Sequence, residues 1–424
     1  MIDSLKRSAE ELFERVSWPS ADEEDWRRTD LSRLLPRGVL DSNADLAGGI
    51  QGAEGWTAAS LPLPEGYAGR VVSENGVVVG LSLPEPLADS GFKTYCCAPG
   101  DYPETLGNLG GAELNDSAER ITAWHYRDMS GCLALELTGE FDKPILVEER
   151  LIARDSRDVR KALFSAPHLH ITATPGARAL VIWTLEGAPK HDESITPIIN
   201  GGLTASVFPG AKLDITLRQN LGASVVAFLH GRLEVEENAE VRFRESHFGA
   251  VLLKTRTRVV LKGVKANARL NGVYAAGRGG HYDIGTVQEH RAAHAVSNAL
   301  YKGAVVNHAI FQGLINVWPH AEKTDAYLTN NNLILGAGAR SDSLPKLNIL
   351  TDDVKCSHGS TTGRLDKNQL FYLETRGYSP EEAVRELIRG FLREAFVNAP
   401  ATAREMLERD IDAAVGVSGP WADG

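Results

Sequence analysis

A cysteine and a histidine lie two residues apart in the run DDVKCSHGSTTGRLD, which covers residues 352–366. Alternate side chains of a β-strand share a face, so Cys356 and His358 would point to one side and Lys355 and Ser357 to the other. A thiolate and a neutral imidazole both bind zinc, iron and iron–sulfur clusters, but two ligands are too few for a tetrahedral site. A metal bound here would therefore need further ligands from elsewhere.

The same pair has two other interpretations. A nucleophile and its base would need a direct thiol–imidazole hydrogen bond, which is awkward for side chains that run parallel from one strand. A structural role, in which a buried cysteine lies beside a hydrogen-bonded histidine in the last coil of the fold, also fits the spacing. The spacing alone leaves these alternatives open.

Four further candidate ligands occur in the run GRGGHYDIGTVQEHRAAH, namely His281, Asp283, His290 and His294. The last two have the spacing of a helical metal pair, but the surrounding residues predict strand and loop, so no metal site is expected there. The chain has no GxxxxGK[ST], GxSxG, HExxH or CxxC motif, and GRGG does not follow a strand and open a helix. We therefore expect no nucleotide to be bound by this chain.

The composition is typical of a folded protein, and the net charge does not favour binding to a polyanion. Hydrophobic residues make up 43% and charged residues 24% of the 424 residues, which is ordinary for a globular protein. The formal net charge is −11, and no long block of one sign interrupts the chain. Nucleic acid is therefore not expected as a partner.

Several features predict a cytoplasmic location. The apolar runs are far shorter than the ~18 residues that span a bilayer, so no membrane-spanning helix is expected. The N-terminal run MIDSLKRSAEELFERV carries charges throughout, unlike a secretory signal. Cys96, Cys97, Cys132 and Cys356 lack the spacing of a disulfide framework and are expected to be reduced thiols.

Residues 1–130 predict an N-terminal region of helices and irregular segments. The run MIDSLKRSAEELFERV predicts an amphipathic helix, because its apolar side chains recur at spacings of three and four. The next stretch, SADEEDWRRTDLSRLL, begins with helix-capping residues and is expected to bury Trp26. A glycine-interrupted helix is compatible with residues 104–130.

Residues 131–365 change to short runs of alternating apolar and polar residues, which predict strands. A turn of small residues followed by alanine recurs before these strands. The alanines are Ala211, Ala239, Ala268, Ala321 and Ala339, so the turns recur unevenly and one interval, from Ala268 to Ala321, is about twice as wide as those before it. The wide interval could hold two coils, so the pattern favours a β-helix with coils of about 18 to 29 residues over a sandwich, whose turns recur every ~8 to 12 residues.

Residues 366–424 predict a C-terminal helical domain. One helix ends at Gly377, and the next begins with Ser379 as N-cap, Pro380 at the first position and Glu382 closing a capping box. This second helix has a continuous apolar stripe, wide enough to bury it against another element. The stripe contains Val384, Leu387, Ile388, Phe391, Leu392, Ala395 and Phe396.

The run from DAYLTNNN through KCSHGS to RELIRGFLREAF, residues 325–396, resembles the SufB/SufD family of iron–sulfur cluster assembly proteins. HYDIGTVQEH and ALYKGAVVNHAIFQGLINV resemble the preceding coils of that family, and EDWRRTDLSRLL resembles its N-terminal tryptophan motif. The resemblance is strong over about 270 to 400 and weak over 40 to 260. The form KCSHG at 355–359, and the absence of the additional cysteines that SufB carries, favour the SufD type.

This resemblance implies a right-handed parallel β-helix between N- and C-terminal helical regions. It also implies a non-catalytic scaffold that pairs with SufB through the β-helix and binds the ABC-type ATPase SufC through C-terminal helices. By position, His358 matches a histidine that contributes to a nascent iron–sulfur cluster or iron at the SufB interface, and Cys356 matches its neighbouring cysteine. The apolar stripe of Val384, Leu387, Ile388, Phe391 and Leu392 would contact the ATPase subunit.

Two alternatives remain beside this expectation. A β-helical polysaccharide lyase or hydrolase would share the solenoid, but it would need a cluster of acidic or basic residues along one groove, which the sequence does not provide. A homodimer could instead hold a metal between two copies of Cys356 and His358.

Overall fold

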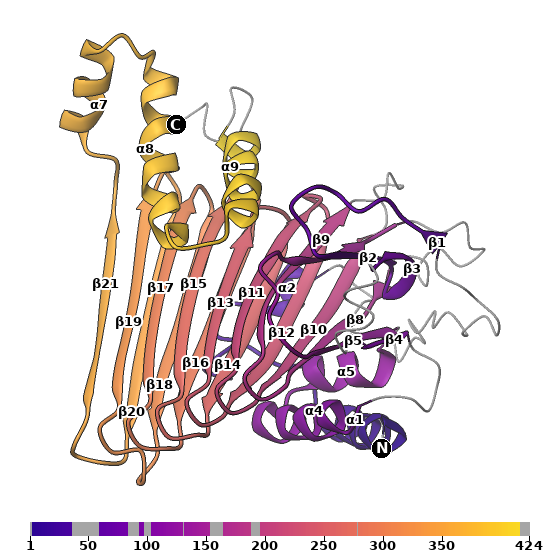
Figure 1. Cartoon of the computed structure of the whole chain (residues 1–424). Coiled ribbons are helices and arrows are strands. Elements are labelled where there is room, and N and C mark those ends of the chain that lie inside the picture. Colours follow the sequence, from indigo (N-terminus) through magenta and orange to yellow (C-terminus); the bar gives the residue numbers. More distant parts are fainter. Residues whose placement is uncertain are drawn as a thin grey trace.

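A computed structural model describes residues 2–35, 59–83, 93–96, 103–129, 131–152, 164–187, 196–277 and 279–415. The chain is mainly β, with 47% of its residues in strands and a parallel β-solenoid of about 6 turns. Helices precede the solenoid strands in the sequence and also follow them (Figure 1). The predicted parallel β-helix with terminal helical regions is therefore confirmed.

Each coil of the solenoid contributes one strand to each of two sheets. In spatial order, the 11-stranded sheet contains β1 (Ala59–Ser60), β3 (Val77–Ser82), β2 (Gly69–Glu74), β6 (Ile145–Arg150), β9 (Arg178–Gly187), β11 (Lys212–Leu221), β13 (Glu240–His247), β15 (Asn267–Ala276), β17 (Val296–Val305), β19 (Asp325–Ile334) and β21 (Lys355–Gly363). The 10-stranded sheet contains β20 (Arg340–Ile349), β18 (His308–Val317), β16 (His281–His290), β14 (Leu252–Leu261), β12 (Val226–Val235), β10 (Ile198–Val207), β8 (Pro167–Ala173), β5 (Gly131–Leu137) and β4 (Lys93–Cys96), with β7 (Phe164–Ser165) beside β10.

The pairing register of the 11-stranded sheet shows where each coil begins. The residues that align from strand to strand are Lys212, Glu240, Asn267, Val296, Asp325 and Lys355, and their even spacing is that of one coil. Ala211 and Ala239 both lie directly before a strand of this sheet, as the repeat predicted. Ala268, in contrast, is inside β15, and Ala339 precedes a strand of the other sheet. Ala266 and Ala295 continue the true repeat, so the predicted alanine marker was partly misplaced.

The space between the sheets holds the main hydrophobic core. Inward positions alternate with outward ones along each strand, as in the pattern of β11, where Leu213, Ile215 and Leu217 face inward. Stacking the same inward position from coil to coil buries a continuous apolar column, which a single coil could not do alone.

Helices cover the two outer faces, which a solenoid otherwise leaves to solvent. The N-terminal helices pack on the 10-stranded sheet and comprise α1 (Ile2–Arg15), α2 (Leu31–Leu34), α4 (Glu104–Ser117) and α5 (Arg120–Asp128). The C-terminal helices comprise α7 (Lys367–Thr375), α8 (Pro380–Arg393), η1 (Glu394–Phe396) and α9 (Ala401–Val415). Of these, α8, η1 and α9 pack on the 11-stranded sheet. The predicted capping box of Ser379 and Glu382 is present at the start of α8.

Within residues 1–130, predicted to be helical or irregular, strands β2 and β3 form an antiparallel hairpin. Asn75 and Gly76 form its two-residue turn, with φ of 50° and 85°. An Asn-Gly pair between apolar runs is a strong hairpin signal because both residues tolerate positive φ. The sequence therefore contained the information for this element.

Candidate functional site

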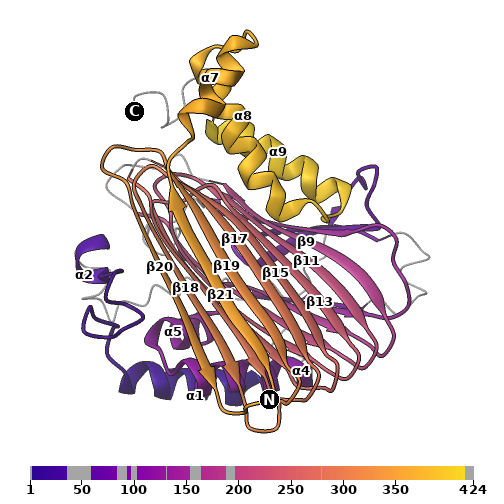
Figure 2. The same ribbon diagram turned by 90° about the vertical axis from the view of Figure 1, so that its left-hand side faces the viewer.

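The solenoid ends in two long edge strands, β20 and β21. Among the described residues, β20 pairs only with β18, and β21 pairs only with β19. Both strands face the viewer in Figure 2, which looks onto this end of the solenoid. At the opposite end, the described strands that finish the sheets are β1 and β4, of 2 and 4 residues. The long unpaired edges are therefore concentrated at one end.

Cys356 and His358 lie in β21 on the face that continues the inner column of the solenoid. Cys356 aligns with Ala326 and His358 with Leu328, and both β19 residues are buried in the core. In β21, however, the Cys356 side chain is only half-buried and His358 is exposed, because no further coil follows. The predicted common face is thus present, and it opens to the end of the molecule.

The two side chains differ in their readiness to bind a metal. Burial raises the pKa of the Cys356 thiol, Asp325 raises it further, and a hydrogen bond with the Ala326 backbone opposes them. The thiol must lose its proton before it can bind a metal, so a cation supplied by a partner would be needed to favour the thiolate. The exposed imidazole of His358 is the more accessible ligand.

Apolar side chains beside this pair were missed by the sequence reasoning. Leu347, Ile349 and Leu350 are 39%, 37% and 52% exposed at the end of β20 and just beyond it. Their signal was present in the alternating run KLNIL, but the strand was not recognised as the last of its sheet. Pro345 in β20 has no N–H to offer to a neighbouring strand, which is typical of edge strands.

Of the other ligand candidates, His281 and Asp283 lie on one strand and both contact Thr29 Oγ1, His281 through Nε2 at 3.1 Å. His290 is buried in β16 and bonds to Ser297 Oγ at 2.8 Å, whereas His294 lies in the following turn. Asp283 is buried, where Lys254 Nζ contacts it at 2.6 Å and Thr29 Oγ1 donates to it at 2.5 Å. No group of three or more potential metal-ligating side chains occurs within the described residues. The open-end pair therefore cannot complete a metal site within this part of the chain.

Asp283 instead anchors the N-terminal tryptophan segment. Trp26 is buried, its indole donates to Glu119 at 3.2 Å, and Lys254 Nζ lies 4.3 Å from its ring centroid. Burial raises the pKa of Asp283, but Lys254 and the hydrogen bonds from Thr29 and Gln312 lower it overall. The segment is thus fixed to the outer face of the 10-stranded sheet by an ionised, fully paired carboxylate.

The predicted ATPase contact is divided between core and surface. Ile388 and Leu392 are buried against the 11-stranded sheet, and Val384 and Phe391 are partly buried against the same cluster. Ile388 and Leu392 therefore hold α8 to the solenoid and are not accessible, which corrects the expectation for these two. Leu387 is half-buried.

Exposed aromatic residues lie on α7 and just after it. Phe371, Tyr372 and Tyr378 are 66%, 56% and 43% exposed, and α7 has no buried residue.

Among the helices that the structure describes, none combines the length and apolar character required for a membrane span.

The chain was compared with known proteins. The family model for the SufBD core domain of SUF system FeS cluster assembly matches residues 156–391. The iron-sulfur cluster assembly protein SufD of Escherichia coli (strain K12) is 37% identical over 259 residues, which cover 58% of this chain and 57% of that protein.

Two further relatives extend the comparison. An iron-sulfur cluster assembly SufBD family protein of Mycobacterium leprae (strain TN) is 30% identical over 54% of this chain and 58% of its own length. A SufBD family protein of Synechocystis is 25% identical over 94% of this chain and 88% of its own length. The matches to the Escherichia coli and Mycobacterium leprae proteins thus span less than two thirds of each relative.

Proposed function

Because the chain belongs to the SufBD family of the SUF iron–sulfur cluster assembly system, we propose that it is a SufD-type scaffold subunit that holds a nascent cluster, or its iron, as cargo at a subunit interface. One observation carries this proposal: His358 is exposed on the inner face of β21, an edge strand that pairs with β19 on one side and with no described strand on the other. A partner that continues the solenoid would lie directly over this ring and could complete the coordination of the metal.

The proposed partner at this end is a SufB-like subunit. A strand of the partner can pair with the free edge of β20 or β21, which supplies main-chain hydrogen bonds in addition to side-chain contacts. The exposed Leu347, Ile349 and Leu350 would supply apolar area to the same interface. In the absence of that subunit, we expect the same edges to pair two copies of this chain as a homodimer.

The proposed partner at the C-terminal helices is a SufC-like ABC ATPase. The exposed aromatic residues Phe371, Tyr372 and Tyr378 support a protein contact there, since aromatic side chains are enriched at interfaces. Leu387 remains a candidate at its margin. The chain itself is proposed to have no catalytic turnover, and family membership favours this role over a polysaccharide lyase or hydrolase.

Co-purification tests these partners. The tagged chain is co-expressed with a SufB-like and a SufC-like subunit and is expected to recover both. The double substitution F371A and Y372A should remove the ATPase and leave the SufB-like subunit bound, while V397A serves as control because Val397 is 64% exposed but lies in the turn after η1. Recovery of neither subunit by the unmodified chain would contradict the proposal.

A further inference from the structure

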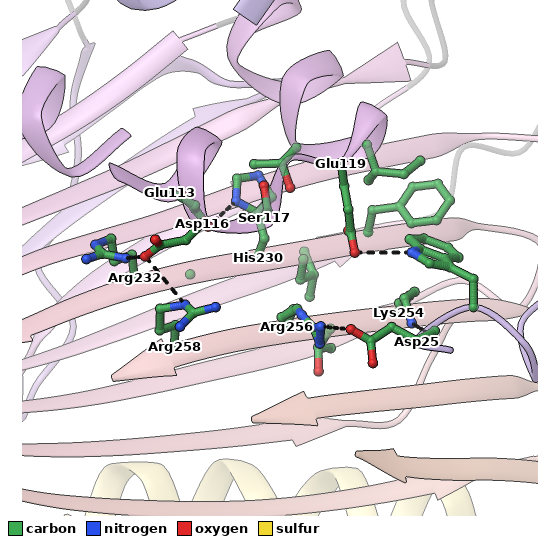
Figure 3. Close-up of a pocket in the computed structure, with 17 residues that line it drawn as sticks. Asp25, Glu113, Asp116, Ser117, Glu119, His230, Arg232, Lys254, Arg256 and Arg258 are labelled. Atoms are coloured by element: carbon green, nitrogen blue, oxygen red, sulfur yellow. Dashed lines mark hydrogen bonds and ion pairs between the residues drawn. The ribbon is translucent and has the colours of Figure 1, made fainter. Parts of the chain in front are cut away.

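A cavity of about 150 Å³ lies between the N-terminal helices and the outer face of β12 and β14. Figure 3 shows its charged side chains arranged around the space under α4 and α5. By this measure one water needs about 10–15 Å³, so the cavity has room for on the order of ten waters. It is thus large enough for a molecule with a similar number of non-hydrogen atoms.

The four cationic side chains that line the cavity are Arg232, Lys254, Arg256 and Arg258, and each has a carboxylate partner. Lys254 contacts the buried Asp283, and Arg258 contacts the buried Glu289. Four carboxylates, from Asp25, Glu113, Asp116 and Glu119, line the same cavity. Because every one of these cations already has a carboxylate partner, the cavity does not favour a polyanionic ligand.

Two residues that line the cavity each have a buried polar atom without a hydrogen-bond partner among the described residues. His230 is only 9% exposed, and its Nδ1 lies 2.8 Å from Glu113 Oε1. Because a carboxylate can only accept, Nδ1 of His230 carries a proton and donates to Glu113. Neither Nε2 of His230 nor the buried Oγ of Ser117 has a hydrogen-bond partner among the described residues.

Glu119 adds a negative charge without a cation. Its Oε1 accepts from the Trp26 indole at 3.2 Å, and no ion pair of this carboxylate occurs in the part of the chain that the structure describes. Burial raises the pKa of the neighbouring Glu113, but His230 and the hydrogen bond from Tyr126 lower it overall, so Glu113 is ionised. This side of the cavity can therefore receive a cationic donor such as an ammonium group.

Arg256 has unused donor capacity within the same cavity. Among the described residues, its guanidinium contacts one carboxylate, that of Asp25, and its side chain is 31% exposed. A guanidinium has five N–H groups and binds carboxylates through two parallel hydrogen bonds. Figure 3 shows Arg256 on the strand side of the cavity and Glu119 on the helix side.

We propose that this cavity binds a free α-amino acid. Its carboxylate would lie on the Arg256 guanidinium, and its ammonium group would donate to Glu119. The remaining side chain would contact the apolar lining supplied by Trp26, Ile121 and Phe228. This site is independent of the interfaces proposed above, so its presence or absence leaves the scaffold role unchanged.

Calorimetric titration of the full chain tests the proposal. The probes are L-alanine, L-serine and L-leucine, with propylamine and propanoate as analogues that carry only one of the two charges. At least one amino acid is expected to bind at least 10-fold more tightly than either analogue. Absence of binding by all three amino acids, or equal binding of an amino acid and a single-charge analogue, would overturn the proposal.

Substitutions assign any binding to this cavity. R256Q and E119Q should each weaken amino-acid binding at least 10-fold, because each removes the partner of one ligand charge. R242Q is the matched control, since Arg242 is also an outward-facing strand arginine with one carboxylate partner, but it lies on the other sheet. Binding should also shift the imidazole ¹⁵N resonances of His230. Unchanged affinity in both R256Q and E119Q would contradict the assignment.

Discussion

His358 and Cys356 share one strand face, yet their surroundings differ. The shared face was predictable because side chains alternate along a strand. The exposure of His358 and the partial burial of Cys356 were not, since both depend on which coil is last in the stack. The sequence therefore identified the pair of candidate ligands, and only the position of β21 at the end of its sheet gave them different accessibility.

The substitution H358A separates a site role from a structural role. Because the ring is exposed, its loss should change the free energy of unfolding by no more than about 0.5 kcal/mol. Cluster formation with SufB-like and SufC-like subunits should nevertheless fall several-fold, as measured by the absorbance of the assembled cluster. H320A is the control, because His320 is also exposed but lies in a turn. An unchanged cluster yield in H358A would remove the site assignment.

Buried histidines make the stability of the chain sensitive to mild acid. Burial lowers the pKa of His170 to about 3 and those of His281 and His290 to about 4, and it lowers those of His125 and His168 well below the usual value. The unfolded chain therefore binds more protons than the folded chain at any pH between these values and about 6.5. Stability is fully present above pH 6.5 and is lost as pH falls below it.

Urea unfolding at pH 7.5 and pH 5.5 measures this effect. Each such histidine contributes up to about 1.4 kcal/mol of destabilisation per pH unit below 6.5, so the free energy of unfolding should fall by several kcal/mol. The carboxylates of Asp283 and Glu289 have lowered pKa values and lose their stabilising charge only at lower pH. Equal stability at the two pH values would contradict this account.

At the level of elements, local signals were sufficient for some predictions and not for others. Helix α8 was predicted because its start depends on Ser379, Pro380 and Glu382, which are adjacent in sequence. The β2–β3 hairpin was missed although Asn75 and Gly76 carry its signal. Strand register could not be predicted, because it depends on contacts between residues about one coil apart.

The contact between β15 and β17 is an example of such a register effect. Gly272 aligns with Tyr301, and Tyr274 aligns with Gly303. A Cβ atom on Gly272 would lie 2.1 Å from the Tyr301 ring, and one on Gly303 would lie 2.2 Å from the Tyr274 ring. Each tyrosine thus fills the space that the facing glycine leaves, and Tyr274 Oη donates to Asn332 at 2.6 Å.

The substitution G303A should therefore destabilise the solenoid. The added methyl group would displace the buried Tyr274 ring, and overpacking of this kind typically costs about 1–3 kcal/mol. Urea unfolding followed by circular dichroism measures the loss. G363A is the matched control, because a Cβ at Gly363 of β21 meets no atom within 4 Å. A loss in G363A as large as that in G303A would contradict the packing explanation.

At the scale of the whole molecule, the helices cover the outer faces of the sheets and leave the end free. The N-terminal helices pack on one sheet and the C-terminal helices on the other (Figure 1). The stack therefore presents β20 and β21 as long edges, with Leu347 and Ile349 exposed beside them. Long apolar edges normally promote association between chains.

The substitution L347K tests association through this end. A lysine at an exposed edge position should weaken pairing with a second copy or with a SufB-like subunit at least 10-fold, while the free energy of unfolding stays within about 0.5 kcal/mol. Light scattering during size-exclusion chromatography measures the oligomeric state. V264K is the control, since Val264 is 42% exposed in a turn away from the edge strands. An unchanged oligomeric state in L347K would place the interface elsewhere.

The unequal ends of the solenoid also limit how many chains can join. A solenoid with long unpaired edge strands at both ends could bind further copies head to tail. Such heterologous interfaces form fibres when they do not close into a ring. Among the described strands, the long edges occur at one end, whereas those that finish the sheets at the other end have 2 and 4 residues. If two such ends meet as proposed, each covers the edges of the other, and we expect association to stop at a pair.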